Sequence, residues 1–262
     1  MGKAETRNLT ETGGGLSAPG NPAFAVETRN LDEADGSRSI PGNPAFAVET
    51  RNLSVSYDGR RVFGGFTFAA EPGEAVLLKG PSGCGKSTFL HALCGLIPGS
   101  IQAEISGDVL ISGKNVRELS LEERAREIGI VFQNPETQIF CGSVEDEIAF
   151  GLENLCLPRD EIGRRIDKML ALTGLTRYRF TSPQELSGGQ KQLVVLSSVL
   201  ALDPRILLLD EALSQLDSDG REALKAQLFE LKREGRTLLM VDHCGELESV
   251  SSRVVDLEVE WR

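Results

Sequence analysis

Apolar residues in this chain recur with two periods, and the alternation between the two predicts an α/β fold. The run Arg205–Glu211 has the continuous apolar stretch expected for a parallel strand that is buried on both faces, and Ala75–Lys79 and Thr237–Val241 are also predicted to be strands. Elsewhere apolar residues return every three or four positions, which predicts helices with one buried face. The clearest helical stripes are Ile162, Ile166, Met169 and Leu170, and Leu224, Leu228 and Leu231, the second ending before Gly235.

Turn and capping residues place further elements around these strands. Asp58-Gly59 separates Val55–Tyr57 from Arg61–Phe63, which predicts an antiparallel hairpin. Residues of about 135–190 have the character of an inserted helical subdomain, with Ser143 as a helix N-cap and Asp146 in the capping-box position. We therefore expect an α/β fold with an antiparallel β subdomain and an inserted helical subdomain.

The ends of the α/β part are also predicted from the pattern. We expect a helix over Thr88–Leu96, directly after the first buried strand, and a closing strand over Val254–Val259. Strands are expected at Phe46–Val48 and Leu53–Tyr57.

The N-terminal part contains a duplication. The segment Pro19–Leu31 recurs identically as Pro41–Leu53, and only the second copy continues into the predicted domain. These copies have too little apolar surface for a stacked repeat architecture. We expect residues 1–44 to be a tandemly duplicated, disordered leader, and residues 45–262 to be the folded domain.

Composition narrows the function classes. The net charge is −11, which disfavours a nucleic-acid or anionic-lipid surface as the main partner. We find no run of about 18 apolar residues that would span a bilayer. The five cysteines show no paired spacing typical of a metal site, which suggests reduced thiols in a cytoplasm.

The most informative motif is a phosphate-binding loop of the form G-x-x-x-x-G-K-[ST], between a predicted strand and a predicted helix. Glycines allow successive backbone N–H groups to face phosphate oxygens, and the helix start adds its positive dipole end. Lys86 supplies a point charge for the β- and γ-phosphates, and the Ser87 hydroxyl can ligate Mg²⁺. The loop predicts a nucleoside triphosphate site made of Gly80, Pro81, Ser82, Gly83, Cys84, Gly85, Lys86, Ser87 and Thr88.

Two carboxylates end the buried strand Ile206–Asp210. Asp210 is placed to hold Mg²⁺, and Glu211 to activate water for attack on the γ-phosphate. A second group of inward-facing backbone N–H groups, after that of the phosphate-binding loop, is expected at the start of a helix, at Ser187, Gly188, Gly189 and Gln190. This segment is either a simple helix N-cap or a second anion site. One chain cannot easily direct both this segment and the phosphate-binding loop at one phosphate.

Together these motifs resemble the nucleotide-binding domain of an ABC transporter. Gly80–Thr88 resembles Walker A, Ile206–Glu211 Walker B, and Leu186–Gln190 the signature segment. The resemblance implies an ATPase of the P-loop fold that uses Mg²⁺ and works as a dimer, with Ser187–Gln190 serving the nucleotide of a second ABC ATPase subunit. Whether that dimer is a homodimer or a heterodimer is left open.

The same resemblance assigns roles to other positions. Gln133 matches the Q-loop glutamine that contacts Mg²⁺ and the attacking water, and His243 matches the switch histidine that contacts the γ-phosphate. Tyr57 matches the aromatic residue that stacks on adenine, and Ser214–Asp217 matches the D-loop. The implied catalytic residues are Glu211, His243 and Gln133, and the implied metal ligands are Ser87, Gln133 and Asp210.

A finer resemblance lies around Gln133–Phe140, the Q-loop, and Val144–Gly151. It is similar to the ATP-binding subunits of energy-coupling factor importers and their cobalt and nickel relatives. It implies integral membrane subunits as partners, a peripheral position on the cytoplasmic face of the membrane, and a vitamin or metal ion as cargo. In that group Gln138 belongs to the surface that receives the coupling helices of the membrane subunit.

Departures and alternatives remain. Asp242 and Cys244 flank His243 where other residues are usual, and Gln215 replaces the usual alanine of the D-loop.

A soluble ABC ATPase of DNA repair or translation is the alternative function. The Walker motifs lie too close together for the coiled coil that is inserted in DNA-repair ATPases, and only one cassette is present where translation proteins carry two. A non-hydrolysing regulatory half of a heterodimer is also left open.

Overall fold

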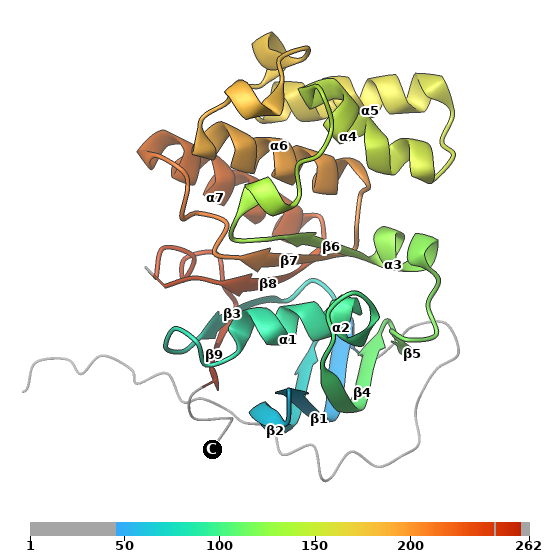
Figure 1. Cartoon of the computed structure of the whole chain (residues 1–262). Coiled ribbons are helices and arrows are strands. Elements are labelled where there is room, and N and C mark those ends of the chain that lie inside the picture. Colours follow the sequence, from blue (N-terminus) through green and yellow to red (C-terminus); the bar gives the residue numbers. More distant parts are fainter. Residues whose placement is uncertain (1–45, 244, 258–262) are drawn as a thin grey trace, which may run out of the picture. The chain divides into compact units, whose positions relative to one another are not determined.

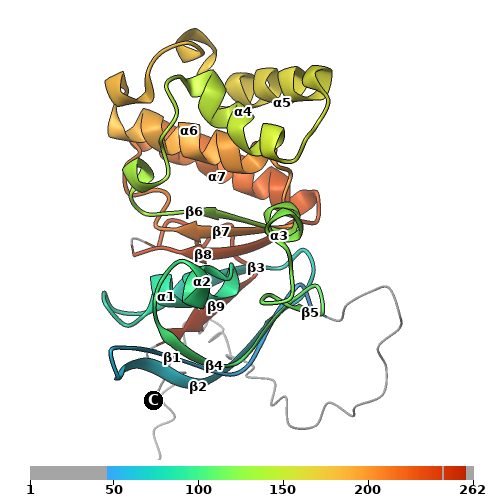
Figure 2. The same cartoon turned by 45° about the vertical axis from the view of Figure 1, so that its right-hand side comes forward.

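The computed structural model describes residues 46–243 and 245–257, which form two β-sheets and the helices around them (Figures 1 and 2). The strands are β1 (Val48–Tyr57), β2 (Arg60–Ala70), β3 (Ala75–Lys79), β4 (Glu104–Ile111), β5 (Lys114–Asn115), β6 (Ile128–Val131), β7 (Ile206–Asp210), β8 (Thr237–Val241) and β9 (Arg253–Asp256). The helices are α1 (Lys86–Leu93), α2 (Leu96–Gly99), α3 (Leu121–Glu127), α4 (Val144–Asn154), α5 (Arg159–Leu172), α6 (Gly188–Ala201) and α7 (Ser218–Arg233), with 3₁₀ turns η2 (Pro135–Thr137), η3 (Thr176–Tyr178) and η4 (Pro183–Glu185).

The central sheet is parallel, with strand order β6-β7-β8-β3-β9. The three predicted strands lie side by side in it as β7, β8 and β3, and every residue of β7 and β8 is buried. Because all strands run in one direction, their carboxyl ends meet at one edge, where the following loops can build a common site.

The second sheet is antiparallel, with order β2-β1-β4-β5. The predicted hairpin at Asp58-Gly59 is confirmed, because Tyr57 pairs with Arg60 and Val55 pairs with Phe63. The expectation of two separate strands before this turn is wrong. One strand, β1, runs through the region, and its pairing is interrupted near Asn52, where φ is 49°.

The parallel sheet separates two hydrophobic cores. Val76 and Leu78 face α1 and the antiparallel sheet, in a core that contains the rings of Phe63 and Phe89. The alternate residues of β3 and its neighbours, such as Leu77, face α6 and α7 on the other side. Figures 1 and 2 show the same arrangement, with α1 on one face of the sheet and α6 and α7 on the opposite face.

Helix α6 joins the helical group, which consists of α4 and α5, to the parallel sheet. Its Val195 and Leu196 belong to the sheet core, whereas Val194 packs with α4 and α5. The predicted stripe of α5 lies in this helical core, with Ile166, Met169 and Leu170 buried and Ile162 partly buried.

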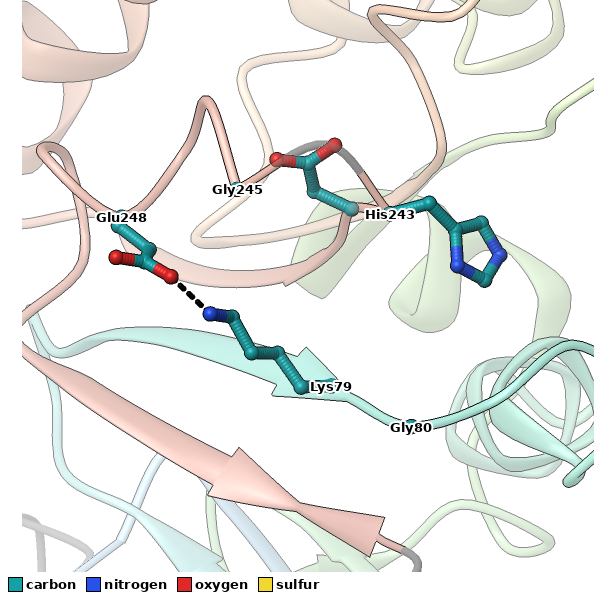
Figure 3. A pocket seen from close by; sticks show the side chains of 6 residues that line it. Lys79, Gly80, His243, Gly245 and Glu248 are labelled. Carbon is teal, nitrogen blue, oxygen red and sulfur yellow. Dashed lines mark hydrogen bonds and ion pairs between the residues drawn. The ribbon is translucent and has the colours of Figure 1, made fainter.

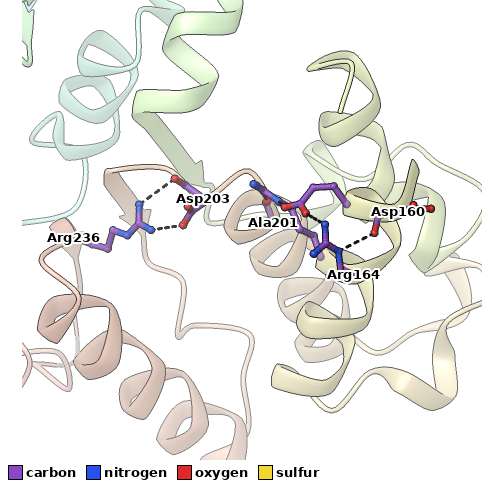
Figure 4. Close-up of polar contacts among 7 residues, drawn as sticks. Asp160, Arg164, Ala201, Asp203 and Arg236 are labelled. Atoms are coloured by element: carbon purple, nitrogen blue, oxygen red, sulfur yellow. Dashed lines mark hydrogen bonds and ion pairs between the residues drawn. The ribbon is translucent and has the colours of Figure 1, made fainter. Parts of the chain in front are cut away.

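Two arginines, Arg165 and Arg236, fix the C-terminal end of α6, and Figure 4 labels Arg236 beside Asp203. Arg165 of α5 donates to the Ala201 carbonyl at 2.8 Å. Arg236, which precedes β8, donates to the carbonyls of Asp203 and Pro204 at 3.1 and 2.9 Å and pairs with the Asp203 carboxylate. The end of α6 therefore contacts α5 at Ala201 and the residue before β8 at Asp203 and Pro204.

Several predicted boundaries need correction. Helix α1 begins at Lys86 rather than Thr88 and ends at Leu93, because Gly95 adopts the left-handed conformation. Strand β9 covers Arg253–Asp256, and residues 258 and 259 of the predicted strand lie outside the described residues.

The predicted capping box of α4 is only half formed. The Ser143 hydroxyl accepts from the Asp146 N–H, but the Asp146 carboxylate accepts from that hydroxyl rather than from the backbone. The predicted leader, residues 1–44, lies outside the described residues. Between residues 46 and 257, apart from residue 244, no helix has the length and apolarity needed to cross a membrane.

Replacing Gly107 with Ala should destabilise the antiparallel sheet strongly. Gly107 has φ of 84°, and an added Cβ would lie 2.4 Å from the Asn52 carbonyl oxygen and 2.5 Å from that of Arg51. We expect the free energy of unfolding to fall by about 3 kcal/mol or more. Gly59→Ala is the matched control, because Gly59 shares a positive φ of 74° but an added Cβ would meet no atom within 4 Å. Denaturant unfolding of both variants tests this, and equal losses would contradict the steric account.

Candidate nucleotide-binding and hydrolysis site

The predicted phosphate-binding loop connects β3 to α1 at the carboxyl edge of the parallel sheet. Gly80, Gly83 and Gly85 have φ of 150°, 78° and 107°, a conformation that glycine adopts readily. Ser87 and Thr88 occupy the first turn of α1, where backbone N–H groups have no partner within the helix. The loop therefore has the backbone shape that a phosphate cradle requires.

Lys86 lies inside this loop rather than extending into solvent. The residue is buried, and its Nζ donates to the carbonyl oxygens of Gly80 and Pro81 at 2.8 and 2.9 Å. The Cys84 sulfur lies 4.0 Å from the same nitrogen. The loop itself thus holds a cation, whereas Pro81, Ser82 and Gly83 are exposed.

Three residues predicted to act in hydrolysis meet where β6, β7 and β8 end. Gln133 Nε2 donates to one carboxylate oxygen of Glu211 at 2.7 Å, and His243 Nε2 lies 2.7 Å from the other oxygen. Glu211 has φ of 51°, which is uncommon for a residue with a side chain, and its N–H donates to the Val241 carbonyl. The backbone after β7 is thus turned so that the carboxylate reaches both neighbours.

Asp210 has the environment expected of a metal ligand. Its side chain is buried, and its Oδ1 has no hydrogen-bond partner among the described residues. Burial lowers the pKa of nearby His91, and the Asp210 charge offsets only part of that effect. A buried carboxylate oxygen without a hydrogen-bond partner in the described part of the chain fits Mg²⁺, which prefers oxygen ligands such as those of Asp210, Ser87 and Gln133.

A pocket opens beside the loop and is lined by Lys79, Gly80, Asp242, His243, Gly245 and Glu248. Lys79 and Glu248 form an ion pair across it, and Figure 3 shows the His243 ring turned away from that pair. The Asp242 carboxylate accepts from the Leu247 N–H at 3.1 Å. This bond closes the turn that follows His243.

The signature segment caps helix α6 with a full capping box. The Ser187 hydroxyl accepts from the Gln190 N–H, and the Gln190 side chain accepts from the Ser187 N–H at 2.9 Å. Gln190 also donates to the Tyr178 hydroxyl at 2.9 Å. Ser187 and Gly188 are exposed at the surface.

Both glycines of the signature segment lie under the D-loop. A Cβ on Gly188 would lie 3.0 Å from the Gln215 side-chain oxygen, and one on Gly189 would lie 3.0 Å from the Gln215 carbonyl. Glycine therefore permits this close approach. The segment stands on the opposite face of the parallel sheet from α1 (Figures 1 and 2), as expected if this segment and the phosphate-binding loop do not serve one phosphate.

A family model described as ABC transporter matches residues 63–214. The chain belongs to the ABC transporter family. It is 45% identical over 190 residues to a putative ABC transporter ATP-binding protein of Methanosarcina acetivorans, covering 72% of this chain but only 30% of that relative. It is 46% identical to one of Pyrococcus horikoshii, covering 65% of this chain and 61% of the relative. It therefore spans less than two thirds of the length of these relatives.

An energy-coupling factor transporter ATP-binding protein of Methanosarcina acetivorans is 40% identical to the chain, over 71% of this chain and 66% of that relative. Among solved structures, CbiO1 of Clostridium perfringens, part of the ABC transporter complex CbiONQ, matches with a TM-score of 0.69 and 30% identity, covering 81% of this chain and 84% of that chain. A dimeric ATP-binding cassette bound to ADP and Pi matches with a TM-score of 0.70 and 26% identity, covering 80% and 93%. The described domain is thus an ABC-type ATPase domain of the P-loop fold.

In this ABC domain, Tyr57 ends β1 and packs, partly buried, against the core that contains Phe89 of α1. Its stacking on adenine stays a prediction.

Gln138 and Gln192 make contacts that sequence reasoning did not include. The expected place of Gln138 on the docking surface for a membrane subunit stays a prediction; its half-buried side-chain amide accepts from Phe132 N–H at 2.7 Å and donates to the Ile130 carbonyl at 3.0 Å. Gln192 of α6 is buried and donates to the Phe132 carbonyl. A polar residue at the start of an otherwise apolar helix run was the only sequence signal for Gln192.

Proposed function

We propose that the chain is the ATP-hydrolysing subunit of a membrane ABC transporter, bound peripherally at the cytoplasmic face of the membrane. The single observation that carries this proposal is the meeting of Gln133, Glu211 and His243 at the edge of the sheet that also holds the phosphate-binding loop. The likeness to energy-coupling factor and CbiO proteins favours an importer of a vitamin or metal ion.

Each residue of the site has its own proposed role in ATP hydrolysis. Glu211 accepts the proton of the attacking water, while Gln133 and His243 each hold one of its carboxylate oxygens in place. Lys86 offers its charge to the β- and γ-phosphates, and Tyr57 provides a ring for adenine. Mg²⁺ held by Ser87, Gln133 and Asp210 would neutralise charge on the phosphates.

A second ABC ATPase subunit would complete the arrangement. The exposed Ser187 and Gly188 at the start of α6 would contact the nucleotide of that subunit through backbone N–H groups. A similar solved ATP-binding cassette is dimeric, which supports this pairing.

An exposed aromatic pair supports the membrane partner. Phe140 and Phe150 stand edge to face with ring centroids 4.6 Å apart, and they are 64% and 45% exposed. The buried Glu147 carboxylate accepts from the N–H groups of Phe140 and Cys141 at 3.0 and 2.8 Å, and burial together with this charge raises the pKa of Cys141 to about 11. Exposed aromatic surface of this kind is typical of a protein interaction site, and we assign it to a coupling helix of the membrane subunit.

Co-purification tests this function. Tagged chain expressed in its native host and recovered from gently solubilised membranes should bring a polytopic membrane protein and a second ABC ATPase subunit. Phe140→Ser should reduce the recovered membrane protein about tenfold, because hot-spot aromatics carry much of the binding energy. Phe229→Ser, on the 40%-exposed Phe229 of α7, is the matched control and should leave recovery unchanged. A purely soluble complex would overturn the transporter proposal.

A further inference from the structure

Two glutamine side chains from different elements hold the backbone of Phe132, which directly precedes Gln133. Gln138 accepts from the Phe132 N–H at 2.7 Å and donates to the Ile130 carbonyl at 3.0 Å. Gln192 Nε2 donates to the Phe132 carbonyl at 3.4 Å. Because the Gln133 side chain reaches Glu211 at 2.7 Å, the position of the Phe132 backbone sets this contact.

Gln192 lowers the stability of the folded state at its position on α6. It is 2% exposed, and its Oε1 has no hydrogen-bond partner among the described residues. A buried, unpaired oxygen destabilises the folded state, whereas a methionine of similar length would fill the same space without that cost. Stability alone therefore does not explain a glutamine here, but its bond to Phe132 does.

The residue before Gln192 contacts the same loop. Lys191 is buried on α6, and its Nζ lies 2.6 Å from the Glu136 carboxylate in η2. The hydrogen bond from Lys191 lowers the pKa of Glu136. Consecutive residues of α6 thus bind the Q-loop at its start and at its 3₁₀ turn.

We infer that Gln192, together with Gln138, is a positioning residue that sets Gln133 against Glu211 and links this contact to the signature segment. The inference rests on the proposed ATP hydrolysis at Glu211. Helix α6 begins at Gly188, in the segment Ser187–Gln190 that is proposed above to contact a second subunit's nucleotide, and Gln192 of the same helix binds Phe132. A displacement of α6 by the second subunit's nucleotide is therefore passed to the chain's own Gln133.

The test is ATP turnover by the full chain carrying Gln192→Met. We expect kcat to fall about tenfold and KM to change less than about twofold, because the substitution misplaces a catalytic contact and leaves the phosphate loop intact. The melting temperature should stay the same or rise. Gln227→Met is the matched control, because Gln227 also donates to one backbone carbonyl, that of Leu172 at 3.0 Å, and also has a buried, unpaired oxygen, but it lies on α7. It should leave kcat unchanged.

A double-mutant cycle distinguishes positioning from general damage. In a Gln133→Ala background, Gln192→Met should cause no further loss of kcat, because both changes remove the same contact. An equal fold-loss in both backgrounds would overturn the inference. If Gln192→Met does not fold, Gln138→Glu serves in the same cycle, since it keeps the acceptor for Phe132 and loses the donor to Ile130.

The outcomes also separate this inference from the proposed function. If the wild-type chain shows no ATP turnover that Glu211→Gln removes, the proposed function fails. If that turnover is present and Gln192→Met retains the wild-type kcat, only the inference fails.

Discussion

Replacing Glu211 with Gln is expected to lower ATP turnover about 10²–10⁴-fold while ATP binding persists. The amide is nearly the same size and keeps an oxygen that can accept from Gln133, but it cannot take a proton from water. Because Glu211 lies apart from the phosphate-binding loop in the sequence and touches Gln133 and His243, its loss should affect chemistry rather than affinity. Steady-state kinetics and titration with a fluorescent ATP analogue measure the two effects separately.

Glu222→Gln is the matched control for this prediction. Glu222 lies on α7 with a side chain that is 76% exposed and paired with Lys225, so its loss should leave turnover within about twofold of wild type. A Glu211→Gln variant that keeps full turnover would remove this residue from the role of general base. Loss of ATP binding in the same variant would instead indicate damage to the fold of the site.

Replacing Lys86 with Met should weaken ATP binding by about 10²-fold or more, with turnover lost at ordinary ATP concentrations. Charge-assisted hydrogen bonds to phosphate are each worth about 1.5–3 kcal/mol, and the ammonium group of Lys86 has one N–H left for phosphate beside the two that bind Gly80 and Pro81. Its buried nitrogen already lies among the carbonyls of Gly80 and Pro81, so little ordering is required when phosphate arrives. Isothermal titration with ATP and Mg²⁺ measures the change.

Lys168→Met on α5 controls for the loss of one positive charge, because Lys168 is exposed and lies in the helical group. Its affinity for ATP should match that of the wild type. An unchanged affinity in Lys86→Met would contradict the assignment of this loop to phosphate. Together, the Lys86 and Glu211 variants separate binding from chemistry at one site.

The elements that sequence reasoning located correctly are those with a strong local signal. Strands β3, β7 and β8 were predicted from short apolar runs, and β7 also because a strand buried on both faces must be apolar at nearly every position. The hairpin at Asp58-Gly59 and the cap at Ser187 were predicted because turns and caps depend on residues only a few positions apart. The limits of α1 and β9 were missed by a few residues, since helix and strand ends respond to tertiary packing as well as to propensity.

By itself, then, the sequence determined the fold class, the phosphate-binding loop and the identity of the residues expected around it, since each has a local pattern with a direct physical cause. Only the tertiary structure decided which side chains meet. Gln133 touches Glu211 because β6 and β7 are neighbours in the sheet, a pairing between segments far apart along the chain. Gln138 turns inward, Gln192 is buried and Phe140 is exposed for the same reason. A side chain's direction and partners depend on the elements packed against it, and those elements come together only when the whole domain folds.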